Sequence, residues 1–377
     1  REVLSYENLV LKATFDPRRI NAELGTAFNS GGRIDARINT GWDDYAPLGG
    51  QISVNTSELV WLELFSPDIM EPKGTLDARI TLGGTRARPQ LGGQARLTNF
   101  STEIPSLAIV MEDGDVRLDA LPDGTARIAG QIRSGEGILR VDGSLNWQNT
   151  SAPLMLTATG QNVLVSDTRD LHAVASPDVQ VRYAAGQPVT VTGTVTVPSA
   201  RIDLERLDQG VSASPDVVVL DPVNPEASAA SPLDLDLTLV LGDDVQLNGF
   251  GLEGGLGGRM RVRSHPGREM TASGQLQVRG RYKAYGQKLD ITRGELSWSG
   301  GPVSDPILNI RAERVMRDVT AGVDIRGGAS APHATSRVSE NRVWIAKYTP
   351  RFAITPTTAA VMPVSAEESD RLPRSRS

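Results

Sequence analysis

Apolar and polar residues alternate at every second position in short runs along most of the chain. Clear examples are Leu154, Leu156 and Ala158, and the longer run of leucines from Leu233 to Leu241. Successive side chains of a β-strand point to opposite faces of the sheet, so each run predicts a strand with one apolar and one polar face. Most runs end near Gly, Pro, Asn or Asp, which are typical of tight turns. The pattern therefore predicts an all-β chain of many short strands joined as a meander.

Helical signals are confined to two short segments. Residues 57–65 begin with a serine that could cap a helix and carry a near-continuous apolar set, and residues 199–207 place Ile202, Leu204 and Leu207 before Gly210. We predict a short helix in each. Parallel sheets connected by helices would need longer apolar runs and longer stretches of helical periodicity, and the sequence has neither.

The chain divides into five parts by pattern. Glycine-led strands recur at residues 73–84, 89–97 and 137–147. We expect the first part of the β-structure in residues 1–70, the repeating strands in residues 71–208 and a further strand region in residues 233–332. Residues 209–232, rich in Pro, Ser, Ala and Asp, are predicted to be a loop or linker. Residues 333–377 lose the alternation, and we expect this tail to be disordered.

Composition agrees with many strands punctuated by turns. The chain has 377 residues, of which 38 are Gly and 23 are Pro, and 39% are hydrophobic. No apolar run is long enough for a transmembrane helix, and the N-terminus lacks a signal-peptide pattern, so we expect any targeting element to lie outside this sequence. The absence of cysteine excludes disulfide and thiol chemistry and is compatible with an oxidising periplasm.

Residues with the chemistry for catalysis are scattered. His172, His265 and His333 lie far apart in the sequence, without a carboxylate and serine arrangement that suggests a triad. No Cys or His spacing typical of a metal site occurs. The net charge of −6 arises from 39 basic and 45 acidic residues spread along the chain, which makes nucleic acid an unsuitable partner. We expect no enzyme activity and no cofactor.

Three further patterns have simple structural interpretations. The pairs Asp43-Asp44 and Asp243-Asp244 are predicted to be turn residues, and Asp234 and Asp236 to be the polar face of a strand. Residues 249–254 match the letters of a dinucleotide-binding glycine motif. An alternating strand follows these glycines, where a nucleotide site needs the start of a helix, so they are predicted to be turn glycines.

A strip of arginines is the one charged pattern with a functional alternative. Arg259, Arg261 and Arg263 lie on one face of a predicted strand, opposite Met260 and Val262. The simpler interpretation is a solvated outer face. The alternative is a strip that contacts anionic lipid headgroups or an acidic partner.

Residues 274–332 carry the most specific pattern of the chain. The segment contains Tyr282-Lys-Ala-Tyr285-Gly286-Gln287, the turn Arg293-Gly294, the element Asp305-Pro306-Ile307-Leu308 and later Ala321-Gly322-Val323. These elements and their spacing closely resemble the C-terminal region of the TamB family, AsmA-like repeating β-groove proteins of the Gram-negative envelope. The Pro-x-Leu-x-Gly step at residues 89–93 extends the resemblance to residues 70–332.

The resemblance implies both a fold and a role. It implies an elongated, curled β-sheet with an apolar concave interior, part of a periplasmic rod whose full-length form is anchored in the inner membrane by an N-terminal segment absent here. It implies phospholipid as the ligand, a TamA-like barrel protein of the outer membrane as the partner, and membranes at both ends of the rod. The expected function is transport of phospholipid between the two membranes and support of outer-membrane protein assembly.

Alternating apolar positions are the expected lining of that groove. They are Leu76, Ala78, Ile80, Leu82, Leu154, Leu156, Val179, Val181, Leu233, Leu235, Leu237, Leu239, Leu241, Leu276, Val278, Leu289, Ile291, Leu296, Trp298, Leu308, Ile310, Val323 and Ile325.

The residues alone leave the alternatives open. The same alternation suits a closed sandwich, in which two apolar faces cover each other, and an open trough. A sheet with an internally packed face could instead be a scaffold that templates barrel strands at its edge and carries no lipid. A β-solenoid adhesin or passenger domain is a third reading, weakened by the lack of a regular Asn or Asp ladder.

Overall fold

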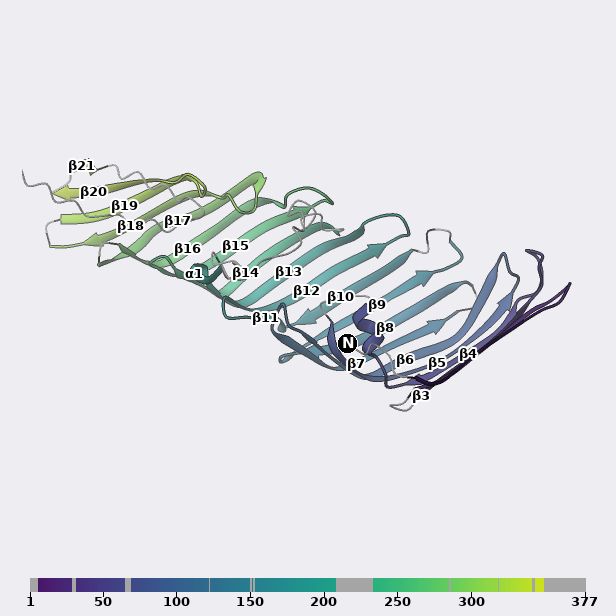
Figure 1. Ribbon diagram of the computed structural model, residues 1–377. Helices are drawn as coiled ribbons and strands as arrows, with labels where there is room; N and C mark the ends of the chain where they lie inside the picture. The colour runs from purple at the N-terminus through teal and green to yellow at the C-terminus, as the bar shows by residue number, and fades with distance from the viewer. Residues whose placement is uncertain are drawn as a thin grey trace, which may run out of the picture.

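The protein forms one long sheet that curves into an open trough in a single layer (Figure 1). This computed structural model describes residues 6–28, 32–64, 69–121, 123–149, 151, 153–207, 233–284, 286–317, 319–340 and 343–348. The linker predicted at residues 209–232 and residues 349–377 of the tail lie outside the described residues. The all-β fold predicted by the alternation and the curled sheet implied by the resemblance are confirmed.

The described residues form 21 strands and two short helical segments. The strands of the first half are β1 (Tyr6–Phe15), β2 (Ile20–Phe28), β3 (Gly32–Thr40), β4 (Gly49–Thr56), β5 (Met70–Gly84), β6 (Pro89–Ile104), β7 (Ile109–Ala120), β8 (Thr125–Ser134), β9 (Gly137–Asn146), β10 (Leu154–Gln161) and β11 (Val163–Asp167). Those of the second half are β12 (Leu171–Tyr183), β13 (Val189–Asp203), β14 (Leu233–Gly249), β15 (Leu252–Ser264), β16 (Thr271–Ala284), β17 (Gln287–Pro302), β18 (Ile307–Val315), β19 (Val319–Gly328), β20 (His333–Glu340) and β21 (Val343–Tyr348). The helical segments are η1 (Val60–Leu64), which is a 3₁₀ turn, and α1 (Leu204–Leu207).

Strands that follow one another in the chain are neighbours in the sheet and pair antiparallel, with two departures. Strands β10 and β11 both pair with β12 and form one interrupted row. Strands β13 and β14 pair in parallel, with Val191 opposite Leu235 and Val195 opposite Leu239. The sheet is therefore two antiparallel meanders joined by one parallel pair, rather than the single meander that the sequence predicts.

Three expectations about secondary structure need correction. The helix predicted at residues 199–207 is wrong for residues 199–203, which continue strand β13, and only Leu204–Leu207 are helical. The helix predicted at residues 57–65 is a 3₁₀ turn at Val60–Leu64. The tail does not lose its strands at residue 333, because His333–Glu340 pair with β19 and Val343–Tyr348 pair with β20.

The register of the sheet places apolar residues opposite one another from strand to strand. Leu76 lies opposite Leu97, which in turn lies opposite Val116. In the second half Leu237 lies opposite Val262. Residues directly opposite in neighbouring strands point to the same face, so these pairs build one continuous apolar face and one polar face.

Bulges keep the apolar residues on that face where the alternation changes phase. In β13 the apolar positions are odd-numbered up to Val197 and even-numbered at Ala200 and Ile202, and the register shifts between residues 197 and 199. Val197 and Ala200 nevertheless belong to the same apolar cluster. Register shifts at comparable places in β5, β6, β7, β12 and β17 also bend the strands, because a bulge increases local twist and curvature.

Candidate functional site

The candidate site is the apolar face of the trough. The register brings the whole predicted lining set to this one face, from Leu76 on β5 to Ile325 on β19. For example, Leu296 lies opposite Leu276 on one side and Leu308 on the other. Ile310 lies opposite Ile325. Side chains more than 200 residues apart in the sequence thus share one surface.

The apolar face is the concave side of the sheet. On β5, Ala78 is buried and Leu76 and Ile80 are half-buried, whereas Asp77 and Arg79, which alternate with them, are exposed. The two faces of a flat single sheet would be about equally open to solvent. Curvature toward the apolar side brings the inner side chains together and explains why they are less exposed than the outer ones.

In the second half of the sheet, buried apolar side chains gather on this face. Met260, Val262, Ala272 and Leu276 are buried and form one cluster, with Trp298 packed against its edge. The indole Nε1–H of Trp298 donates a hydrogen bond to the carbonyl oxygen of Val303 at 3.0 Å. This bond fixes the ring at the wall of the groove, because a buried indole needs a partner for its single donor.

Several residues of this face were not among the predicted lining. They include Leu97 on β6, Ile128 on β8 and the pair Met260 and Val262 on β15. Met260 and Val262 alternate with the arginines of residues 259–263, so the sequence pattern does indicate that these two residues lie on the apolar face. On β6 and β8 glycines and short runs interrupt the pattern, so the pairing partner, and not the local sequence, identifies these positions.

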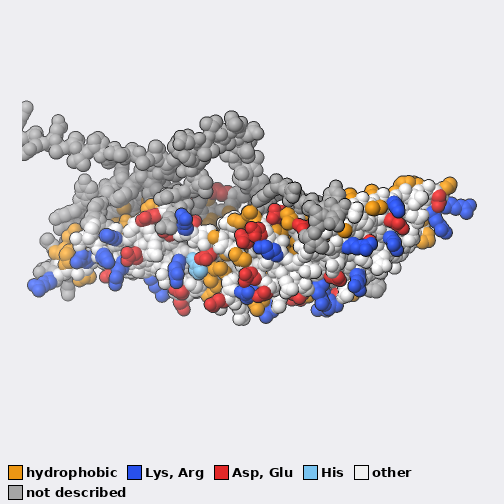
Figure 2. All heavy atoms as spheres, turned by 60° about the horizontal axis from the view of Figure 1, so that its bottom comes forward, with side chains coloured by type: hydrophobic (Ala, Val, Ile, Leu, Met, Phe, Trp, Pro, Cys, Tyr) orange, Lys and Arg blue, Asp and Glu red, His pale blue; other side chains and the backbone are white. Residues whose placement is uncertain are grey.

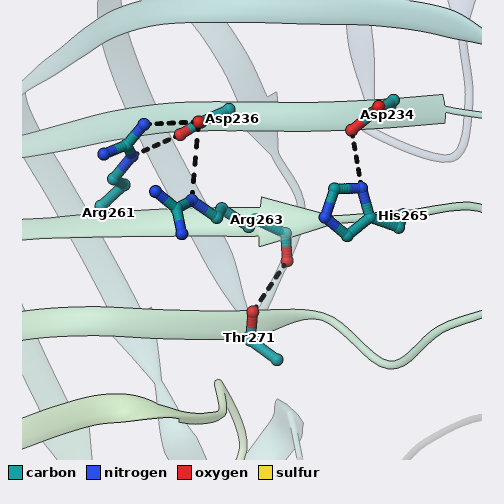
Figure 3. A network of polar contacts seen from close by, with 6 residues as sticks. All are labelled: Asp234, Asp236, Arg261, Arg263, His265 and Thr271. Atoms are coloured by element: carbon teal, nitrogen blue, oxygen red, sulfur yellow. Dashed lines mark hydrogen bonds and ion pairs between the residues drawn. The ribbon is translucent and has the colours of Figure 1, made fainter.

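The arginine strip lies on the opposite, polar face (Figure 3). Arg261 donates to both carboxylate oxygens of Asp236 at 2.5 Å, and Arg263 Nε lies 3.5 Å from the same carboxylate. Close by, directly after the end of β15, His265 Nδ1 lies 2.9 Å from Asp234 on β14. Asp234 and Asp236 are on the polar face of β14, as the sequence predicts. Two of the three arginines thus have a partner within the sheet.

The ion pair around Asp236 has an electrostatic consequence. The hydrogen bond from Arg261, reinforced by its charge and that of Arg263, lowers the pKa of Asp236 in spite of partial burial. The carboxylate therefore stays charged at neutral pH. Exposed pairs of this kind add little to stability.

A second ionic cluster lies on the polar face near the end of the sheet. Asp324 on β19 is buried and lies 2.8 Å from Arg311 Nε and 2.9 Å from Arg337 Nε. Burial alone would raise the pKa of Asp324, but the hydrogen bond from Arg311 and the charges of the neighbouring arginines outweigh it, and the pKa is lowered. Charged side chains of both signs are interspersed over the face shown in Figure 2.

Groups with catalytic chemistry are dispersed. His172 lies 2.8 Å from Asp167 at the surface, on a different part of the sheet from His265. Within the described ranges no three His, Asp or Glu side chains come together in a way that could hold a metal ion. No helix within these same ranges has the length and apolarity needed to cross a membrane.

The three turn predictions have different outcomes. Of the glycines at residues 249–254, Gly251 lies in the turn with Phe250, Gly249 ends β14 and Gly254 lies inside β15, so a strand and not a helix follows the match to a dinucleotide motif. Asp43 and Asp44 also lie in a turn. Asp243 and Asp244 do not: they lie inside β14 at a register shift, where Asp244 accepts a hydrogen bond from Ser199 Oγ at 3.0 Å.

Comparison with known proteins gives matches over both halves of the chain. The family model of the TamB C-terminal domain matches residues 126–341, and that of the TamB N-terminal domain matches residues 2–97. The chain is also similar to the translocation and assembly module subunit TamB of Haemophilus influenzae, with 29% identity over 310 residues. That match covers 76% of this chain but 23% of the relative, so the chain spans less than a quarter of the relative's length.

Proposed function

Since the chain belongs to the TamB family, we propose that it is a segment of a translocation and assembly module subunit whose groove shields phospholipid acyl chains in the periplasm. The observation that carries the proposal is the unbroken apolar face, which the register extends across the whole sheet. A role as a lipid track requires no catalytic group and no cofactor.

The physical argument rests on the cost of exposing acyl chains to water. Each methylene group removed from water is worth about 0.8 kcal/mol, so a lipid with two chains leaves a membrane only very slowly without an apolar surface to receive it. Neighbouring strands are spaced by about 4.8 Å, so the strands of this sheet, side by side, form a trough on the order of 90 Å long. A continuous track of that length supports movement of lipid without repeated exposure of its tails.

The family match also supports a proposal for the partner and the compartment. We propose a TamA-like barrel protein of the outer membrane as the partner and the periplasm as the compartment, and the similarity to a translocation and assembly module subunit supports both. We propose that the open sheet edges are the docking surfaces for that barrel, because unpaired strand edges present backbone donors and acceptors. Arg259 is available on the polar face for an anionic partner, since in the described part of the chain it has no ion-pair partner.

Native mass spectrometry with lipid extraction tests the groove. The chain, purified from a Gram-negative host, is expected to retain phospholipid. Leu237→Asp places a charge on the apolar face between Gly193 and Val262 and is expected to abolish retention. Thr238→Asp is the matched control, because it adds the same carboxylate one position along, on the polar face opposite Arg261.

The outcome separates the groove from the scaffold. Loss of lipid in the first variant alone supports a lipid-lined apolar face. A folded wild-type chain without lipid, or equal loss in both variants, would overturn the proposal. The scaffold reading would then be favoured by the exposed edge strand β1, where Leu11 is 70% exposed. Its test is site-specific crosslinking from β1 to a barrel protein.

A further inference from the structure

One long edge of the second meander carries three turns that follow one another in space. They connect β14 to β15, β16 to β17 and β18 to β19. The register shows that these turns lie at the same end of the strands, since Leu252 is opposite Tyr282 and Asp290 is opposite Glu313. In Figure 1 these strands run side by side, and α1 lies at this edge beside β14.

The first turn exposes an aromatic residue in a strained conformation. Phe250 is 60% exposed and has a φ of 50°, in the left-handed region that residues other than glycine rarely occupy. Its backbone N–H donates to a carboxylate oxygen of Glu205 on α1 at 2.8 Å. The turn is therefore held in a shape that costs backbone strain and leaves an apolar ring in water, a combination typical of sites retained for function.

The second turn places two like charges opposite each other. Lys283 and Lys288 are directly paired in the register of β16 and β17, which is an unfavourable cross-strand arrangement. Both side chains are exposed, and neither has an ion-pair partner among the described residues. The backbone N–H of Lys283 donates to the carbonyl oxygen of Gly251 at 2.7 Å, which ties this turn to the first.

A hollow of about 600 Å³ extends from the second turn to the third. Its lining includes Lys288, Asp290, Glu313 and Val315. Asp290 lies 3.6 Å from Arg281, and Glu313 lies 3.8 Å from an arginine of its own strand. The carboxylates of the hollow are thus already paired with arginines, and the lysine charge has no counter-ion within it.

The third turn exposes two apolar side chains between two arginines. Val315 is 81% exposed and Met316 is 47% exposed. Arg314, which donates to Gln287 Oε1, precedes them and Arg317 follows them. Hydrophobic side chains at a turn with flanking cations are the pattern that inserts shallowly into a membrane interface.

We propose that these three turns form a docking edge for an anionic phospholipid surface. The edge is defined by Phe250, Lys283, Lys288, Val315, Met316 and Arg317. Lys283, Lys288 and Arg317 are exposed and have no ion-pair partner among the described residues, so charge complementarity favours a negatively charged surface for this edge. The exposed apolar tips favour a lipid surface, because they can enter the acyl region while the neighbouring cations stay at the headgroups.

Vesicle co-flotation of the whole chain tests the proposal. The chain is expected to bind vesicles that contain about one third phosphatidylglycerol and to leave vesicles of phosphatidylcholine alone unbound. Lys283→Gln combined with Lys288→Gln is expected to weaken binding about 30-fold, the loss that two surface cations predict. Val315→Ser combined with Met316→Ser is expected to weaken it about tenfold or more.

A charge-matched control distinguishes binding at this edge from nonspecific electrostatic attraction to the vesicle. Arg79→Gln with Arg96→Gln removes two exposed cations from the polar face of β5 and β6 and is expected to leave binding within about twofold. Equal weakening by the two pairs, or absence of a preference for phosphatidylglycerol, would overturn the proposal. Circular dichroism of each variant confirms that the sheet is retained.

The proposals of a docking edge and of a lipid groove can be refuted independently of each other. Leu237→Asp alters the apolar face and is expected to leave vesicle binding unchanged. The paired lysine substitutions are expected to leave lipid retention in native mass spectrometry unchanged. If Leu237→Asp abolished vesicle binding and the lysine variant did not, the groove would be the contact with the vesicle and the docking edge would be refuted.

Discussion

Leu276→Ala tests whether the trough is a one-layer sheet in which each strand depends on its neighbours alone. Leu276 is 4% exposed and packs with Met260, Val262 and Ala272 in one apolar cluster. The substitution removes three carbon atoms from a buried position. At about 0.8 kcal/mol for each, the lost burial is about 2.4 kcal/mol.

The expected effect is local because contacts run from strand to neighbouring strand, as in repeat proteins. Hydrogen exchange followed by mass spectrometry should show about 60-fold faster exchange in the peptides of β15, β16 and β17, the factor that corresponds to 2.4 kcal/mol. Exchange in β1 to β9 should stay unchanged. Leu82→Ala, at a half-buried position of β5, is the matched control and should give a smaller effect confined to β4, β5 and β6.

Two results would refute this reasoning. Faster exchange along the whole sheet would mean that the trough unfolds as one cooperative unit. Unchanged exchange in β15 to β17 would mean that the apolar face contributes little to holding the strands together.

Two further predictions concern charge and curvature. Asp324→Asn is expected to destabilise β18 to β20 by about 1–3 kcal/mol at neutral pH, because Arg311 and Arg337 lose their shared counter-ion, as hydrogen exchange of these strands would show. Since the pKa of Asp324 is lowered in the fold, its stabilisation is present above the ordinary value of 3.8 and is lost as the pH falls through the lowered pKa. The wild-type chain should therefore lose stability in acid more steeply than the variant in urea titrations. Gly93→Ala should destabilise by about 2 kcal/mol or more, because Gly93 has a φ of 107° and a Cβ there would overlap the carbonyl oxygen of Arg79, whereas Gly257→Ala, with open space around it, should be neutral in the same titration.

Alternation predicted the two faces of the sheet because side-chain direction in a strand is a local property. The common face of the leucines from Leu233 to Leu241 can be predicted without knowing which strands pair with this one. The structure places these leucines on one face. The polar positions between them, Asp234 and Asp236, were equally predictable.

The order of pairing was not predictable from local pattern. The parallel pair of β13 and β14 depends on where the chain returns after residue 203, which the alternation within each strand does not encode. The helix expected at residues 199–207 failed for a related reason. A bulge after Val197 moves Ala200 and Ile202 onto the apolar face, and this phase change imitates helical spacing in the sequence.

Whether the apolar face is covered or open is decided by curvature, which alternation does not report. Gly93 lies opposite Ile80, and Gly143 lies opposite Leu156, on the inner face. At both glycines a Cβ would overlap the backbone of the neighbouring strand, so only glycine lets the strands approach there. A large residue facing a glycine allows the sheet to bend toward its apolar side, and the bend brings inner side chains together without a second layer. The curved sheet thus shields its own apolar face from solvent in part. A closed sandwich would shield that face completely, and a flat sheet would not shield it at all.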